Sequence, residues 1–247
     1  MSNLTKIAIV GGHGNVSMRL ARILSARPNT QVLSIFRNPQ QTEDVSGTGA
    51  SPLVLSLEDD PKEKFAEAFE NKDIIYFSAG AGGGASPERT RKVDYEGALK
   101  VFDAIELVNG EKPRLIIVSA IDIRDPNVIP AHYNDEDKAV SEMIRNVMPV
   151  YMQAKYDADK NLVKRTAFKW TIIRPGGLSN EPGTGKASIG RAHFKKTISK
   201  DDIAYTLALL ADRPDAAGLA IDVAAGDDKI EDALDAFIKK GETDFLG

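Results

Sequence analysis

Two short segments of the chain have residue types and spacings that suit chemistry. Gly11, Gly12 and Gly14 follow the apolar segment 6–10 and precede a segment with helical periodicity. Backbone N–H groups at the start of a helix attract anions, and glycines let a phosphate approach them closely. Tyr151 and Lys155 are four residues apart, so on a helix they share one face, where the ammonium group can lower the pKa of the phenol. The first segment suits phosphate binding and the second suits proton transfer.

The glycine-rich segment has the context of a dinucleotide-binding turn. Gly11 permits a tight turn after a buried strand, and Gly14 lets the backbone approach a pyrophosphate. The third small residue of the pattern is Ser17, which still allows close packing of helix on strand. We therefore predict that this turn binds a dinucleotide through Gly11, Gly12, His13, Gly14, Asn15 and Val16. The alternatives are an ordinary strand-to-helix turn and, for His13, an exposed loop histidine.

The end of the second predicted strand indicates which dinucleotide binds. Sites that prefer NAD place an aspartate or glutamate there, to bind the ribose 2′-hydroxyl. This strand ends instead in Arg37, whose guanidinium group can form paired hydrogen bonds with a 2′-phosphate. We predict NADP(H), with an ordinary surface arginine as the alternative. The adenine is expected beside Ser56 and Leu57, and the acidic residues 58–60 are expected to form a solvent-exposed helix entry.

Around these segments the chain alternates short apolar runs with segments of helical periodicity. Such runs indicate buried parallel strands, and helix-length connections indicate crossovers. The predicted strands are 6–12, 31–37, 52–57, 73–79, 113–120, 170–174 and 219–223. The predicted helices are 15–27, 61–70, 87–108, 136–147, 150–165, 200–210 and 230–240, with loop or weak helix over 38–50 and a glycine-rich loop over 175–190. The pattern predicts an α/β fold: a single doubly wound Rossmann domain with a mainly parallel central sheet and helices on both faces.

Length, composition and charge limit the possible functions. The chain has 247 residues without a break in composition, so we expect one domain over 1–247, whose C-terminal part, about 175–247, borders the substrate crevice. The lack of cysteine excludes thiolate chemistry, and three scattered histidines predict no metal site. A net charge of −4 argues against nucleic acid as a partner, and no apolar run approaches the ~20 residues of a membrane span. We expect a cytoplasmic monomer or homodimer that acts on a small molecule.

Four segments together resemble a known superfamily. They are residues 11–17, Ser78-Ala79-Gly80-Ala81-Gly82-Gly83, Val118-Ser119-Ala120, and residues 171–178. The chain resembles the short-chain dehydrogenase/reductase superfamily, and more closely its atypical NAD(P)H-binding branch, which includes NmrA-like and flavin- or biliverdin-reductase-like proteins. The resemblance implies that Ala79, Gly80 and Ala81 line the nicotinamide and that the backbone of Pro175 and Gly176 meets its amide. A tight turn at a strand end is the alternative for each.

The same resemblance implies a set of catalytic residues. Reductases of the superfamily use serine, tyrosine and lysine with asparagine as a fourth member, and the matching positions here are Ser119, Tyr151, Lys155 and Asp94. Reduction of a carbonyl places charge on its oxygen, so the tyrosine donates a proton, the serine holds the oxygen, and the lysine also holds the cofactor ribose. Aspartate at 94 departs from the family pattern and puts the usual water-linked proton relay in doubt.

A second Tyr-x-x-x-Lys pattern, Tyr156 to Lys160, follows the first at once. We favour the first pair because its helical face continues to Ala158 and Leu162, which suits packing on the sheet. The alternative is that Tyr151 is an amphipathic surface residue and that Lys155 binds only the cofactor ribose.

Three functions are compatible with these residues. The first is an NADP(H)-dependent oxidoreductase of the atypical short-chain type that acts on a small carbonyl, quinone or similar acceptor. The second is a non-catalytic NADP(H)-binding sensor or regulatory protein. The third, a sugar-nucleotide epimerase or dehydratase, is the weakest, because the region after the sixth strand is short for a substrate domain. The Tyr151–Lys155 pair favours the enzyme, whereas Asp94 and the lack of a substrate motif favour the sensor.

Overall fold

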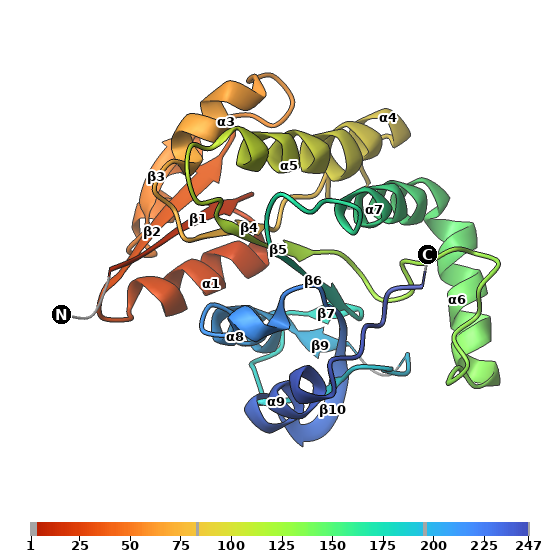
Figure 1. The fold of residues 1–247 in the computed structure, drawn as a ribbon. Helices are drawn as coiled ribbons and strands as arrows, with labels where there is room; N and C mark the ends of the chain where they lie inside the picture. The colour runs from red at the N-terminus through yellow and green to blue at the C-terminus, as the bar shows by residue number, and fades with distance from the viewer. Residues whose placement is uncertain (1–3, 83, 195–196, 247) are drawn as a thin grey trace.

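An eight-stranded sheet runs through the middle of the molecule in the computed structural model, which describes residues 4–82, 84–194 and 197–246 (Figure 1). Gly83, part of the fourth-strand segment named above, lies outside the described residues. The strands stand in the order β3-β2-β1-β4-β5-β6-β10-β8. Their bounds are β1 Thr5–Val10, β2 Thr30–Phe36, β3 Ser51–Val54, β4 Ile74–Phe77, β5 Arg114–Val118, β6 Trp170–Pro175, β8 Lys186–Ile189 and β10 Ala220–Lys229.

The strand order is that of a doubly wound Rossmann sheet. Neighbouring strands are parallel except β8, which pairs antiparallel with β10. The order reverses between β1 and β4, and ligands of such sheets bind at the carboxyl ends of the strands beside this reversal. A separate pair of short parallel strands, β7 (Leu178–Ser179) and β9 (Ile198–Ser199), lies beside the main sheet.

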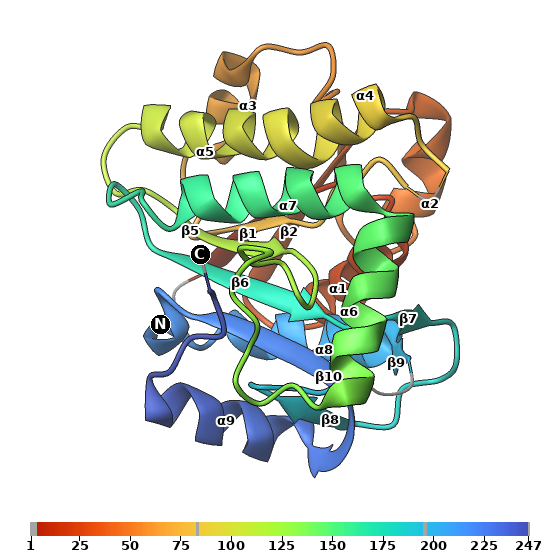
Figure 2. The same cartoon turned by 90° about the vertical axis from the view of Figure 1, so that its right-hand side faces the viewer.

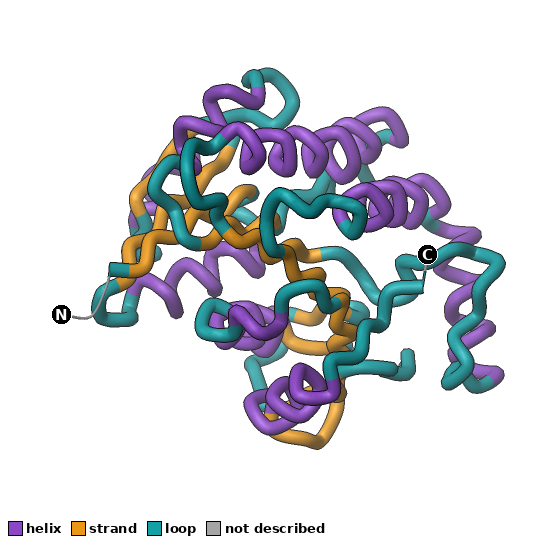
Figure 3. The backbone as a smooth tube through the Cα atoms, viewed as in Figure 1, coloured by secondary structure: helices purple, strands orange, loops and turns teal. Residues whose placement is uncertain are grey.

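Helices cover both faces of the sheet. α1, α8 and α9 pack on one face and α3, α5 and α7 on the other, each over its own apolar core, while Figure 3 shows the strands together between them. Within the described residues, no helix is long and apolar enough to cross a membrane. The helix bounds are α1 Asn15–Ser25, α2 Thr42–Ser46, α3 Lys62–Phe69, α4 Pro87–Thr90, α5 Gly97–Leu107, α6 Asp135–Val147, α7 Pro149–Leu162, α8 Lys200–Leu210 and α9 Ile230–Lys240.

The predicted α/β fold with a mainly parallel sheet is confirmed, but the region 175–190 was wrongly predicted as loop. It contains β7 and β8, and the last strand continues to Lys229 instead of ending at 223. β8 can pair with this extension because β10 carries Gly226, where a Cβ atom would lie 2.3 Å from the Ser188 nitrogen. Edge pairing of this kind depends on a distant partner strand, so a local apolar pattern does not reveal it.

The predicted helix 87–108 is interrupted. A π-helical stretch, Arg91–Glu96, separates α4 from α5 and carries Asp94. π-Helical turns inside helices occur frequently at functional sites, because the wider turn re-aims a side chain. The segment predicted as loop or weak helix, 38–50, contains a 3₁₀ turn, Pro39–Gln41, and the short helix α2.

Candidate functional site

The glycine-rich turn joins β1 to α1 and leaves the start of that helix open. Gly11 has a φ of +84°, and a Cβ atom there would lie 2.7 Å from the backbone of Ala79 at the end of β4. Gly14 is the N-cap of α1 and supplies no side-chain hydrogen bond to the first turn, in which no described residue is acidic. The N–H groups and partial positive charge of α1 are therefore available to an anion.

A cavity of about 1020 Å³ lies in front of this turn, at the carboxyl ends of β1, β4, β5 and β6. Its volume is in the range of cofactor and ligand sites. The predicted site residues that line it are Gly14, Asn15, Val16, Ala79, Gly80, Asp94, Ser119, Tyr151, Lys155, Pro175 and Gly176. The predicted residues outside its lining are Gly11, Gly12, His13, Arg37, Ser56, Leu57 and Ala81.

Lys155 and Asp94 form a buried ion pair at the base of the cavity. Lys155 Nζ lies 3.1 Å from Asp94 Oδ1, and both side chains are at least 95% buried. The ammonium group also lies 3.3 Å from the carbonyl oxygen of Val118, and Asp94 Oδ2 accepts a 3.0 Å hydrogen bond from the Ala81 nitrogen. Asp94 therefore ties the lysine of α7 to the turn after β4.

Tyr151 stands one helical turn before Lys155 and faces the same cavity. The Lys155 nitrogen lies 5.9 Å from the centre of the Tyr151 ring. Burial raises the pKa of Tyr151, Lys155 opposes that rise, and Asp94 and Asp159 add to it, so the net pKa is raised. The ammonium group of Lys155 acts in the expected direction, but burial, the largest effect, and the two carboxylates outweigh it. Tyr151 remains protonated at neutral pH, which suits a proton donor and not a base.

Ser119 has a partner that the sequence analysis missed. Its Oγ donates a 2.6 Å hydrogen bond to Oδ2 of Asp159, which is fully buried on α7. Asp159 follows Lys155 by four residues, so its place on the same helical face was the available signal. Burial raises the pKa of Asp159 to about 6, although Ser119, Arg174 and Lys155 all act to lower it.

The second tyrosine–lysine pair lies away from the cavity. Tyr156 is buried against Ile123 and Met152, and Lys160 Nζ donates a 3.2 Å hydrogen bond to its hydroxyl oxygen. Neither residue is among those that line the cavity. The geometry thus favours Tyr151 and Lys155 as the pair that can act on a ligand.

Arg37 belongs to a small charged cluster at the end of β2. Arg37 Nη1 lies 2.5 Å from Glu58 Oε1, and Arg89 Nη2, from α4, lies 3.3 Å from the same oxygen. The Glu58 side chain is 18% exposed and held between the two arginines, whereas Asp59 of the predicted solvent-exposed helix entry is exposed. Burial raises the pKa of Glu58, but the two arginines outweigh burial and lower it. Arg89, which comes from a distant segment, was missed.

The remaining predicted contacts of the nucleotide make bonds or packing contacts within the protein. His13 Nε2 lies 3.1 Å from Asp44 of α2. Ser56 Oγ donates a 2.8 Å hydrogen bond to Asp59, and Leu57 packs on the core beneath α5.

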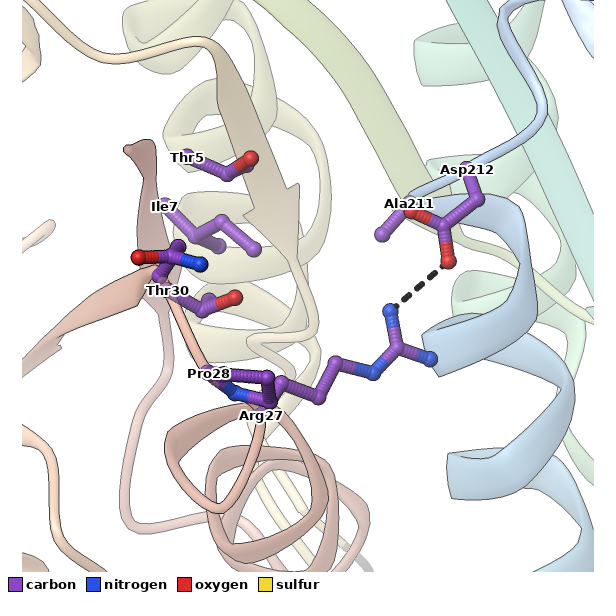
Figure 4. Close-up of a pocket in the computed structure, with 8 residues that line it drawn as sticks. Thr5, Ile7, Arg27, Pro28, Thr30, Ala211 and Asp212 are labelled. Atoms are coloured by element: carbon purple, nitrogen blue, oxygen red, sulfur yellow. Dashed lines mark hydrogen bonds and ion pairs between the residues drawn. The ribbon is translucent and has the colours of Figure 1, made fainter. Parts of the chain in front are cut away.

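A second, smaller cavity of about 320 Å³ lies at the opposite end of the sheet (Figure 4). Thr5 and Thr30 begin strands there, and Arg27 Nη1 pairs with Asp212 at 2.9 Å across it. Its described charged groups are thus paired with each other, and it lies at the amino ends of the strands. Parallel sheets bind ligands at the carboxyl ends, which leaves the larger cavity as the candidate site.

The fold and the open helix start in a large cavity define a dinucleotide-binding protein. Residues 11–214 match the model of the NAD(P)H-binding family. The chain belongs to that family, within the atypical short-chain dehydrogenase/reductases. Solved structures similar to it include an oxidoreductase and a putative NAD-dependent epimerase/dehydratase. The residues present fit a nicotinamide dinucleotide, since Gly14, Asn15 and Val16 offer backbone N–H groups and the cavity continues past them to Tyr151.

Three known proteins are similar to this chain along nearly their whole lengths. A Schizosaccharomyces pombe protein of the UPF0659 group is 36% identical over 246 residues, covering 98% of both chains. A Bacillus subtilis protein named as uncharacterized sugar epimerase YhfK is 33% identical over 229 residues, covering 93% of this chain and 98% of its own. The solved oxidoreductase YlbE of Lactococcus lactis is 26% identical with a TM-score of 0.77, covering 95% of this chain and 97% of its own.

Proposed function

We propose that this protein is an NADP(H)-dependent oxidoreductase that reduces a small carbonyl, quinone or similar acceptor. The observation that carries the proposal is that Tyr151, a protonated phenol beside a buried lysine, lines the same cavity as the open start of α1. One cavity therefore holds an anion site for the dinucleotide and a proton donor for its reaction partner. The choice of NADP(H) rests on the two arginines, Arg37 and Arg89, at the end of β2.

In this proposal each polar group of the cavity has one role. A reduced nicotinamide cofactor, when bound, would supply a hydride to the acceptor carbon, and the acceptor oxygen would then need a proton. Tyr151 donates that proton, and Lys155 stabilises the tyrosinate that remains until solvent protonates it again. Asp94 holds Lys155 in position, and Ser119, once Asp159 is protonated, can donate its hydroxyl proton to the acceptor oxygen from the end of β5. Pro175 and Gly176 line the same cavity after the end of β6.

The test is NADPH oxidation with a panel of quinones, aldehydes, ketones and flavins. Tyr151→Phe keeps the ring and removes the proton, so turnover should fall by about 10²- to 10⁴-fold while NADPH affinity is unchanged. Tyr156→Phe is the matched control on the same helix, because Tyr156 lies outside the cavity lining. If Tyr151→Phe turns over an acceptor at the wild-type rate, the assignment of Tyr151 is wrong and a reductase without an acid residue is the better account.

A non-catalytic NADP(H) sensor is the second candidate. It is favoured by the pairing of Ser119 with Asp159 and of Lys155 with Asp94, which satisfies both polar groups without a substrate. A sensor predicts tight NADPH binding, no turnover with any acceptor of the panel, and no effect of Tyr151→Phe on affinity.

A further inference from the structure

Helix α6 buries polar side chains and exposes some of its apolar ones, although Val140 and Ile144 are half-buried. Its buried residues are Asp137 and Ser141, whereas Met143 and Val147 are 56% and 72% exposed. A helix that packs on a protein core normally buries its apolar face. The exposed apolar side chains of α6 therefore call for an explanation other than core packing.

A buried polar network holds α6 in this orientation. Asp122, which is fully buried, accepts hydrogen bonds from Ser141 Oγ at 2.7 Å and from Arg145 Nε at 3.1 Å. Arg145 also donates a 2.6 Å hydrogen bond to the Asp122 backbone oxygen, and Arg124 lies 2.6 Å from the same carboxylate. Because a buried carboxylate with several donors is costly to disrupt, α6 cannot easily rotate to hide its apolar face.

The C-terminal end of α6, with Ile144 and Val147, leads into the large cavity. Six apolar residues, here called the apolar rim, line the cavity where α6 meets α7 and where β7 begins: Ile144, Val147, Met148, Pro149, Val150 and Leu178. In Figure 2, α6 runs downward from the start of α7, and β7 lies to its right. Val147, Met148, Val150 and Leu178 are all among the exposed large hydrophobic residues of the described chain. The outer part of the cavity is thus apolar and open.

The cavity offers little positive charge to a second anionic ligand. Among the described residues that line it, the cations are Lys155 and Lys200. Lys155 is paired with Asp94, and Lys200 donates a 2.7 Å hydrogen bond to Asn180. Lys200 directly follows β9, which pairs with β7, so among the described lining residues it is a single cation beside the Leu178 end of the rim.

We infer that the apolar rim binds a neutral, apolar acceptor, such as an aromatic ketone or a quinone, and does not bind a sugar nucleotide. The inference rests on the proposed function, because it places the acceptor in the same cavity as the dinucleotide. A sugar nucleotide brings a diphosphate that needs cationic partners and hydroxyl groups that need hydrogen bonds, and the rim supplies neither. An apolar ring, by contrast, removes the exposed rim side chains from water.

The test measures binding separately from turnover. Calorimetry on protein saturated with NADP⁺ gives the affinities of menadione, phenanthrenequinone and UDP-glucose. Val147→Glu places a carboxylate on the rim and should weaken quinone binding by at least about tenfold, because that charge loses water when a ring covers it. Met143→Glu is the matched control, since Met143 is an exposed apolar residue of the same helix outside the cavity lining.

The inference is supported if Val147→Glu weakens quinone binding and Met143→Glu leaves it unchanged. The inference is overturned if neither quinone binds, if the two variants act alike, or if UDP-glucose binds more tightly than the quinones. Light scattering gives the oligomeric state. If the wild type is a dimer and Val147→Glu is a monomer, the rim is an interface between copies of the chain and the inference is overturned. Quinone binding without NADPH oxidation would uphold the rim and remove the proposed reductase activity, so the two failures are distinguishable.

Discussion

Ser119 at the end of β5 donates its hydroxyl proton to Asp159 on α7 across 2.6 Å. While Asp159 is ionised, this proton is not available to a substrate oxygen. When Asp159 is protonated, the carboxylic acid can donate to Ser119 Oγ, and the serine hydroxyl is then free to point into the cavity. The pair therefore couples the charge state of a buried carboxyl to the donor capacity of the site.

This pair predicts a dependence of stability on pH. Burial raises the pKa of Asp159 to about 6 from its ordinary 3.8, so between these values the folded protein holds a proton that the unfolded chain has released. Stability should fall as the pH rises through this window, by about 3 kcal/mol in total at one site. Asp159→Asn has no such titration, and its free energy of unfolding should fall less between pH 4 and pH 7, as measured by urea unfolding.

Asp222, whose pKa burial raises to about 7, adds a similar fall that remains in the variant. The matched control for Asp159→Asn is Asp135→Asn, because Asp135 is exposed at the start of α6 and should keep the wild-type pH dependence. Identical pH profiles for Asp159→Asn and the wild type would contradict the raised pKa.

The Lys155–Asp94 pair predicts a large, non-additive loss of stability. Lys155→Met leaves the Asp94 carboxylate buried without its partner, which should cost about 3–5 kcal/mol of unfolding free energy. Asp94→Asn with Lys155→Met removes both charges and should recover much of that loss. Urea unfolding of the two single variants and the double variant gives the coupling energy. Additive losses would mean that the two side chains do not interact.

Substitutions of Arg37 and of Glu58 should have opposite effects on the affinity for NADPH. Arg37→Ala should weaken NADPH by roughly 10- to 150-fold, the equivalent of losing a charge-assisted contact of about 1.5–3 kcal/mol, and change NADH little. Glu58→Gln frees both Arg37 and Arg89 from a competing carboxylate and should tighten NADPH. The measurement is calorimetric titration with each cofactor, with Arg22→Ala on the exposed side of α1 as control. If Arg37→Ala lowers the affinities for NADPH and NADH equally, Arg37 does not bind the 2′-phosphate.

Gly14→Val should abolish NADPH binding and leave the protein folded. Gly14 has a φ of −63°, which any residue can adopt, so the backbone itself does not require glycine. A Cβ atom there already lies 3.1 Å from the Gly11 oxygen and 3.3 Å from Ser17 Oγ, and the two further methyl groups of valine would fill the approach to the helix start. Calorimetry and circular dichroism separate binding from folding, with Gly47→Val as control, where the Cβ atom meets neighbours at 3.4 Å or more. Normal affinity in a folded Gly14→Val variant would place the dinucleotide elsewhere.

The amino-acid sequence by itself determined the order of the elements and the place of the glycine-rich turn. Apolar runs and helical periodicity are local properties, so they predicted β1, α8 and α9 closely, and the fold class followed from their alternation. The spacing of Tyr151 and Lys155 is also local, because residues four apart on a helix share a face. Those two side chains line the cavity together, as their spacing indicated.

Contacts between distant segments were decided by the tertiary structure alone. The partners Ser119 and Asp159 are 40 residues apart and Arg89 and Glu58 are 31 apart, so no local pattern pairs them. The burial of Ser141 and the exposure of Val147 on α6 depend on a buried Asp122 network that periodicity cannot reveal, since the same pattern would fit a helix rotated about its axis. Burial sets the pKa values of the site, and burial is a property of the assembled molecule: it keeps Tyr151 protonated, although Lys155, one turn away, acts to lower its pKa.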